Sequence, residues 1–163
     1  MPTISAHGIT ARLPSGFEGR IFVRPTIGPI TSHPIAHFGT FPIPNDIGDF
    51  GSGAVNVMGP SDVFATLFDY GPESVGKRLF ARQGRPVGLT PADFRPMLLR
   101  RALAGQSGTQ WFFTEAGRPF SFYAVLGNHA IRSQLVPRVN QLLSSLSLSP
   151  TAPATPAPAA LGN

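Results

Sequence analysis

The chain has 163 residues, of which 42% are hydrophobic and 13% are Asp, Glu, Lys or Arg, about half the charged share of an ordinary soluble domain. This balance excludes a disordered chain and a long solvated helix, and 18 glycines with 18 prolines exclude an all-helical bundle. Because the chain has no cysteine, disulfides, thiolate zinc sites and cysteine nucleophiles are excluded as well.

Short apolar or alternating runs bounded by turn residues predict about six to seven strands. They are expected at residues 8–13, 20–24, 35–41, 54–58, 63–70, 109–114 and 120–126. We expect 54–58 and 63–70 to form one hairpin, and 109–114 and 120–126 to form a second that turns at residues 115–118. The second hairpin is the clearest prediction because large aromatic side chains are concentrated in it.

The clearest helix follows this second hairpin. Apolar residues recur there at spacings of three and four, at Ile131, Leu135, Val139, Leu142, Leu143 and Leu146. Asn128 is a candidate N-cap, and Pro137 requires either that the helix begins there or that it kinks. Shorter helices are expected at 72–80 and 91–103. The sequence therefore predicts an α+β domain, an antiparallel sheet packed by a C-terminal helix and one or two short helices.

The domain is expected to span residues 1–149. Residues 150–163 are rich in Pro and Ala and carry no charge, so we expect them to form a flexible tail. The first eight residues have neither a basic start nor an apolar run, and no stretch approaches the roughly 20 apolar residues of a membrane span. We therefore expect a cytoplasmic protein.

Several stretches resemble known families. The pattern I-x-x-x-L-P-x-G-aromatic-x at 9–18 and the ending V-N-Q-L-L-S-S-L-S-L at 139–148 resemble the PsbP-like α/β/α sandwich, whose terminal helix packs on an antiparallel sheet. Residues 16–21, 48–55 and 113–120 resemble an uncharacterised family of small proteins from GC-rich bacteria. The first resemblance implies an accessory or binding role, and the second implies no activity, since fold alone does not transfer function.

Two loops are candidate ligand sites. Residues Gly71–Arg78 fit the G-x-x-x-x-G-K pattern of a phosphate-binding loop, but Arg78 stands where the magnesium-binding Ser or Thr belongs, and Glu73 would repel phosphate. In the Asp46–Gly53 loop, Asp46 and Asp49 lack the spacing of a calcium loop. A surface turn and a structural loop are the simpler interpretations of these segments.

The four histidines, His7, His33, His37 and His129, lack zinc-site spacing, so no metal or cofactor is expected.

Charge is concentrated in one segment. Residues 1–76 carry a net charge of −3, residues 77–101 carry +6, and the remainder carries +2. The candidates for binding an acidic partner or an anion are Lys77, Arg78, Arg82, Arg85, Arg100 and Arg101, although a merely solvated face is an open alternative. The only aromatic residues in 77–101, Phe80 and Phe94, are expected in the core, which argues against nucleic acid as the partner.

The sequence thus favours a non-catalytic protein-interaction or assembly module that binds a partner or a second copy. The aromatic hairpin would use one face for the helix and the other for the partner. The alternative is a small-molecule or anion-binding domain, or a weak enzyme, that uses the Asp46–Gly53 loop or the Gly71–Arg78 loop.

Overall fold

The computed structural model describes residues 1–29 and 31–151; most of the expected tail, residues 152–163, lies outside the described residues. Eight strands are present in this part of the chain: β1 Thr3–Ala6, β2 Ile9–Arg12, β3 Glu18–Phe22, β4 Ile35–Gly39, β5 Val63–Asp69, β6 Ser107–Glu115, β7 Arg118–Leu126 and β8 Leu146–Leu148. The same residues form one α-helix, α1 Arg132–Ser145. They also form five short 3₁₀ turns: η1 Pro72–Ser74, η2 Arg78–Phe80, η3 Pro91–Asp93, η4 Pro96–Leu98 and η5 His129–Ile131.

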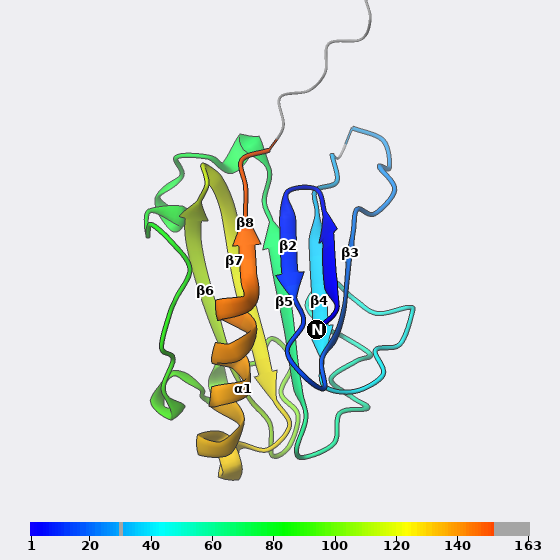
Figure 1. Ribbon diagram of the computed structural model, residues 1–163, viewed down its shortest axis with the longest axis vertical. Helices are drawn as coiled ribbons and strands as arrows, with labels where there is room; N and C mark the ends of the chain where they lie inside the picture. The colour runs from blue at the N-terminus through cyan, green and yellow to red at the C-terminus, as the bar shows by residue number, and fades with distance from the viewer. Residues whose placement is uncertain (30, 152–163) are drawn as a thin grey trace, which may run out of the picture.

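The strands form two antiparallel sheets (Figure 1). The larger sheet has the order β3-β4-β5-β7-β6, and the smaller has the order β1-β2-β8. The predicted α+β class, with antiparallel strands and a C-terminal helix, is confirmed. The strands number eight and divide between two sheets because two short strands at the ends of the domain, β1 and β8, pair with β2.

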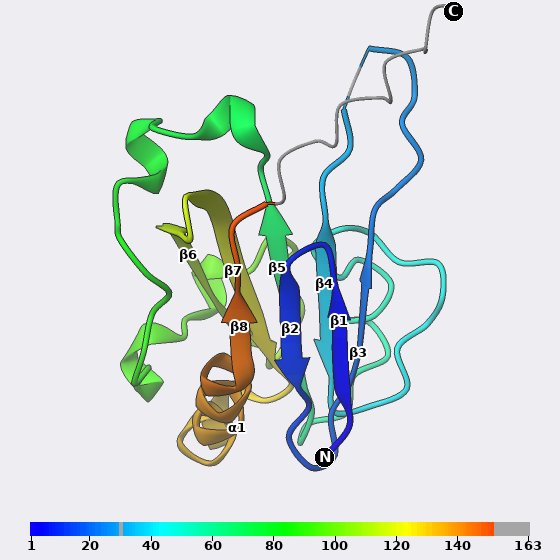
Figure 2. The same ribbon diagram turned by 45° about the horizontal axis from the view of Figure 1, so that its top comes forward.

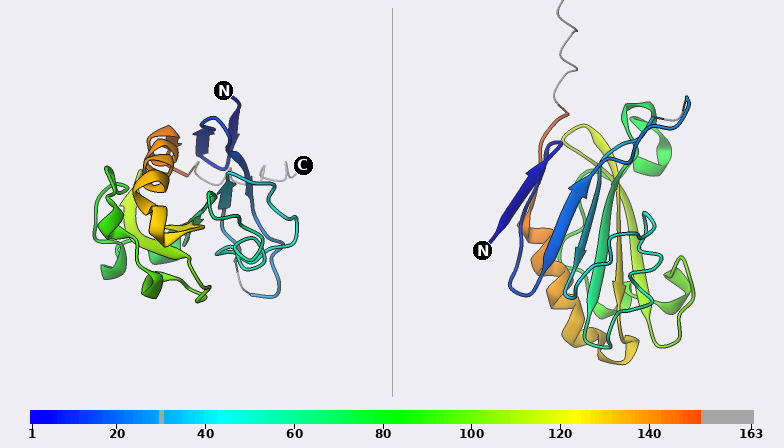
Figure 3. Two further views of the ribbon diagram at one scale, coloured as in Figure 1. Left: turned by 90° about the horizontal axis from the view of Figure 1, so that it is seen from below. Right: turned by 90° about the vertical axis from the view of Figure 1, so that its right-hand side faces the viewer.

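Helix α1 and the smaller sheet lie side by side on one face of the larger sheet (Figure 3). Because β8 follows α1 directly, the helix and the small sheet form one layer. Period-two alternation along β7 turns Phe120, Phe122, Ala124 and Leu126 toward this layer. The predicted stripe of the helix is buried against them at Leu135, Val139, Leu142 and Leu143.

The second face of the larger sheet is covered by the β4–β5 connection, residues 40–62. Ile47 and Val55 of this connection pack on Phe64, Tyr123 and Val125 of the sheet, and all five are at least 93% buried. The sheet face that we expected to receive a partner is therefore covered here by the chain's own loop.

The outer edge of the larger sheet, strand β6, is covered by residues 81–105, which we call the strap. Backbone hydrogen bonds join the strap to Thr114 near one end of β6 and to Gly108 near the other. Between these points Leu89 and Phe94 are buried in the core. A covered edge strand cannot pair with another chain over its whole length, which protects the sheet against aggregation.

The predicted strand at 54–58 is wrong. This stretch forms turns instead, with hydrogen bonds from Ala54 N to Gly51 O (2.9 Å) and from Val57 N to Ala54 O (3.0 Å). Gly51 and Gly53 have φ of 89° and 95°, which bends the backbone away from an extended path. Strand β5 accordingly pairs with β4 and β7 and not with 54–58.

The predicted helices at 72–80 and 91–103 are present only as the single turns η1 to η4. Three of these turns begin with a proline, which starts a turn but cannot donate the hydrogen bonds that extend it. The expected core positions are confirmed, with Phe80 3% and Phe94 1% exposed.

The C-terminal helix differs in detail from the prediction. Asn128 does cap, through a hydrogen bond of 3.0 Å from Ala130 N to its side chain, but it caps the turn η5 that leads into the helix. The helix begins at Arg132, so Pro137 lies inside it and not at its first position. Leu146 is buried as expected, but it belongs to β8.

Candidate binding site at one end of the sheet

The six basic residues that the sequence offers as one binding face do not share one surface. The strap and the turns before it run along the length of β6, so the charges are spread from one end of the sheet to the other (Figure 1). They fall into three groups: Lys77 with Arg78, Arg82 with Arg85, and Arg100 with Arg101.

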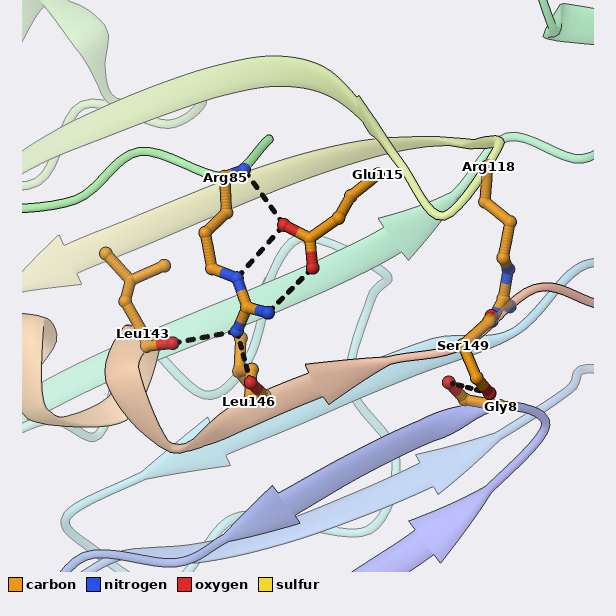
Figure 4. Close-up of polar contacts among 7 residues, drawn as sticks. All are labelled: Gly8, Arg85, Glu115, Arg118, Leu143, Leu146 and Ser149. Carbon is orange, nitrogen blue, oxygen red and sulfur yellow. Dashed lines mark hydrogen bonds and ion pairs between the residues drawn. The ribbon is translucent and has the colours of Figure 1, made fainter. Parts of the chain in front are cut away.

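Arg85 is committed to the interior of the domain (Figure 4). Its guanidinium donates to the carboxylate of Glu115 through Nε at 3.1 Å and through Nη2 at 2.6 Å. The same group donates to the carbonyl oxygen of Leu143 at 3.0 Å and to that of Leu146. Since the Arg85 and Glu115 side chains are only 19% and 20% exposed, Arg85 fastens the helix end and β8 to the hairpin turn.

Two other predicted residues lie over aromatic rings. The guanidinium carbon of Arg82 is 4.9 Å from the ring centroid of Trp111, and that of Arg100 is 3.6 Å from the ring centroid of Phe50. Such stacking fixes the position of a guanidinium and leaves its N–H edge available.

The Asp46–Gly53 loop is packed onto the sheet. The carbonyl oxygen of Asp49 accepts hydrogen bonds from His37 Nε2 and Thr66 Oγ1, each at 2.9 Å, and the Asp49 carboxylate pairs with Arg24. Burial of His37 lowers its pKa to about 4, so the ring is neutral at physiological pH. The geometry is that of a structural loop, as the simpler interpretation expected.

The Gly71–Arg78 loop also has the simpler geometry. Strand β5 ends at Asp69, and the three-residue turn η1 follows where a phosphate-binding loop would lead into a long helix. The backbone N–H of Gly71 donates to Asp69 Oδ1 at 2.7 Å. The carboxylate of Glu73 bonds to His33 at 2.6 Å.

A cleft of about 760 Å³, which we call the end cleft, opens beside this loop. Several connections meet there, all at the end of the sheet from which the β3–β4 loop rises (Figure 2). The cleft is lined by residues from five parts of the chain: His7 and Gly8 in the β1–β2 turn, Val23, His33 and Pro34 around the β3–β4 loop, Asp69, Gly71, Pro72 and Val75, the β6–β7 turn at Ala116 to Pro119, and Ser149 to Thr151.

The floor of the end cleft holds a buried ion pair. Arg118 Nη2 lies 2.7 Å from Asp69 Oδ2, and the two side chains are only 4% and 6% exposed. Arg118 also donates to the carbonyl oxygen of Ser149 at 3.1 Å (Figure 4). The hydroxyl of Ser149 donates to the carbonyl oxygen of Gly8 at 3.2 Å. The pair thus joins the ends of β5, β7 and β8.

A second polar pair crosses the cleft wall. His33 Nε2 lies 2.6 Å from Glu73 Oε1, which ties the β3–β4 loop to η1. A bond to its own backbone and then the bond to His33 lower the pKa of Glu73, so the carboxylate is ionised. Gly71 is required here, because it has a φ of 80° and a Cβ atom would overlap with the His33 ring.

Apolar side chains are exposed around this end of the domain. Val23 and Val75 line the cleft and are 39% and 50% exposed. Ile27, in the β3–β4 loop, is 79% exposed, and Leu79, in η2, is 57% exposed. Lys77 and Arg78 lie in the same stretch and are exposed as well.

Comparisons with family models, with curated proteins and with solved structures found no match for the chain. In residues 1–29 and 31–151, no helix has both the length and the apolar character needed to cross a membrane.

The sequence indicated only part of this site. It singled out Gly71, Glu73 and Lys77 as members of a short motif, but it did not connect them with Asp69 or Arg118. The two residues of the buried pair are 49 positions apart, and each ends a strand next to a turn. The one sequence signal for this ion pair was that residues of opposite charge, Asp69 and Arg118, stand at the ends of two predicted strands. That signal is informative only once the pairing of β5 with β7 is known.

Proposed function

We propose that the protein is a non-catalytic binding module that holds an extended apolar segment of a partner protein in the end cleft. The observation that carries this proposal is the combination of a 760 Å³ cleft with exposed Val23 and Val75 on its lining. Exposed apolar side chains around a concave surface are characteristic of protein contact sites.

The polar groups of the cleft favour binding over catalysis because they are already paired with one another. Asp69 bonds to Arg118, Glu73 bonds to His33, and the Ser149 hydroxyl bonds to a backbone carbonyl. A nucleophilic site instead requires a hydroxyl within reach of its base. Paired charges give the cleft a fixed shape and leave recognition to the apolar lining.

The charge beside the cleft selects the kind of partner. Lys77 and Arg78 are exposed, and neither side chain has a carboxylate partner in the part of the chain that the structure describes. We infer that the bound segment carries acidic residues next to its apolar ones, since opposite charge steers encounter and fixes orientation. A cytoplasmic location of the complex stays a prediction from the sequence.

Site-specific photocrosslinking in the native cell tests the proposal. A photoreactive amino acid replaces Val75 in the cleft or, as the matched control, Met97, which is 79% exposed in η4 away from the cleft. We expect one partner protein to be captured from position 75 and not from position 97. Equal capture at both positions would refute a binding site in the cleft.

A titration with the captured partner's segment then measures the contribution of the lining. Val75→Asp adds a charge at an exposed position, so its effect on folding should be within about 0.5 kcal/mol. We expect this variant to bind at least about tenfold more weakly than the wild type, and Met97→Asp to bind normally. Unchanged affinity of Val75→Asp would contradict the proposed role of the apolar lining.

The small-molecule alternative rests on volume, because 760 Å³ lies within the roughly 300–1,000 Å³ typical of ligand pockets. It would be favoured if position 75 captured no protein while a metabolite extract from the same cell raised the melting temperature of the wild type but not of Val75→Asp.

A further inference from the structure

A second cavity lies between the end of the strap, the β4–β5 connection and the second face of the larger sheet. The end of the strap lies toward the end of the larger sheet opposite η1 (Figure 1). It has a volume of about 180 Å³ and shares no lining residue with the end cleft. Its walls include Phe50 from the β4–β5 connection, Arg100 and Arg101 from the strap, and Tyr123 from β7. We call it the Arg100 pocket.

The two arginines of this pocket have no anionic partner within residues 1–29 and 31–151. No hydrogen bond or ion pair in the described part of the chain uses the guanidinium of Arg100 or Arg101, in contrast to Arg85 and Arg118. The 3.6 Å contact with the Phe50 ring holds the Arg100 guanidinium against an aromatic surface. A guanidinium held in this way presents its N–H groups to a planar oxyanion without losing further conformational freedom.

The wall formed by Tyr123 supplies a further donor. The Tyr123 side chain is 2% exposed, and its oxygen accepts a hydrogen bond of 2.9 Å from Arg100 N. Burial raises the pKa of Tyr123, so the phenol stays protonated, yet its O–H has no acceptor among the described residues. A buried hydroxyl normally finds an acceptor, so an unused O–H at a cavity wall indicates a place for a ligand oxygen.

The remaining walls combine three apolar residues with the polar Ser52 and Gln106. Val55, Leu99 and Val125 line the same cavity, so a bound molecule must offer carbon atoms to them as well as oxygen atoms to the donors. A bare phosphate ion has no such atoms. A short dicarboxylic acid has both, with one carboxylate for each unpaired arginine and methylene groups for the apolar wall.

We propose that the Arg100 pocket binds a small dicarboxylate. One carboxylate bonds to the Arg100 guanidinium and the Tyr123 hydroxyl, the second bonds to Arg101, and the chain between them packs on Val55, Leu99 and Val125. This site is separate from the end cleft and does not depend on what the end cleft binds.

Titration of the full chain with succinate, followed by amide NMR shifts at constant ionic strength, tests the proposal, with acetate and inorganic phosphate as comparison ligands. We expect saturable binding of succinate, with acetate and phosphate each at least about tenfold weaker, since acetate lacks the second carboxylate and phosphate lacks the carbon chain. Arg101→Gln should weaken succinate binding about tenfold toward the acetate value.

The control is Arg95→Gln, which removes another exposed positive charge of the strap, one that does not line the pocket. This variant should bind succinate as the wild type does. Tyr123→Phe should also weaken succinate binding. If Tyr123→Phe proves unstable, Arg101→Gln still tests the proposal, because the Arg101 side chain makes no hydrogen bond in the described structure and its loss should not affect folding. The absence of saturable succinate binding, equal affinity for phosphate, or an equal loss in Arg95→Gln would each overturn the proposal.

Discussion

The substitution Arg85→Gln distinguishes a structural arginine from a binding arginine. It removes the two bonds to Glu115 and the bonds to the carbonyl oxygens of Leu143 and Leu146. Breaking a fully buried ion pair costs about 3–5 kcal/mol. Here both side chains are about one-fifth exposed, and Glu115 keeps its bond from the backbone N–H of residue 85, so we expect a loss of about 2–3 kcal/mol.

The matched control is Arg82→Gln, three residues earlier on the same strap. That side chain contributes only its contact with the ring of Trp111, so its loss should cost about 0.5–1 kcal/mol. Urea unfolding followed by circular dichroism measures both values against a total stability of about 5–15 kcal/mol. If Arg85→Gln were no more than 1 kcal/mol less stable than Arg82→Gln, the network in Figure 4 would not fasten β8 as argued.

Two further predictions concern the backbone and pH. Gly71→Ala should lower the free energy of unfolding, measured in urea, by about 2 kcal/mol or more, because the new Cβ atom overlaps with the His33 ring. The control is Gly76→Ala, where φ is 82° but no atom lies within 4 Å of the new Cβ, so we expect a loss of about 1 kcal/mol. Equal losses in the two variants would contradict the close approach of His33 to Gly71. The pKa of His37 is about 4 in the folded protein and about 6.5 in the unfolded chain. Between these pH values the unfolded state therefore binds more protons than the folded state. The free energy of unfolding should fall by about 3 kcal/mol as the pH drops from 6.5 toward 4. His37→Gln should remove that part of the pH dependence, and an unchanged slope in the variant would show that other groups cause it.

The sequence predicted those elements whose pattern is local. The concentration of aromatic residues in β6 and β7 and the apolar stripe of α1 are visible in windows of ten to fifteen residues, and all three elements formed within a few residues of the expected ranges. The prediction for 54–58 was wrong because Ala54 and Val55, two consecutive residues of the β4–β5 connection, are both buried against the sheet, and a short apolar run of this kind has the same pattern as a strand. Strand β8 was assigned to the helix because leucines at Leu142 and Leu146 keep helical spacing across the boundary.

The end cleft could not be predicted from local patterns. Its lining comes from turns between residues 7 and 151, and only the antiparallel order of the strands brings those turns to one end of the sheet. The motif at Gly71–Arg78 drew attention to one wall, but its spacing did not reveal the geometry of that wall. A backbone N–H of that loop is already bonded to Asp69, so it is not free to bind a phosphate.

The basic segment 77–101 shows why a local excess of charge does not define a binding face. What an arginine does depends on the group placed opposite it, and pairing partners come from distant parts of the chain. Arg85 meets Glu115 and becomes structural, whereas the guanidinium of Arg100 lies on the Phe50 ring and forms no ion pair with any residue that the structure describes. The basic residues of this segment therefore divide into the structural Arg85 and two groups without an ion-pair partner among the described residues, Lys77 with Arg78 at one end of the sheet and Arg100 with Arg101 toward the other. If this division is correct, high salt should weaken ligand binding at both ends while leaving the Arg85 pair, which is mostly shielded from solvent, largely intact.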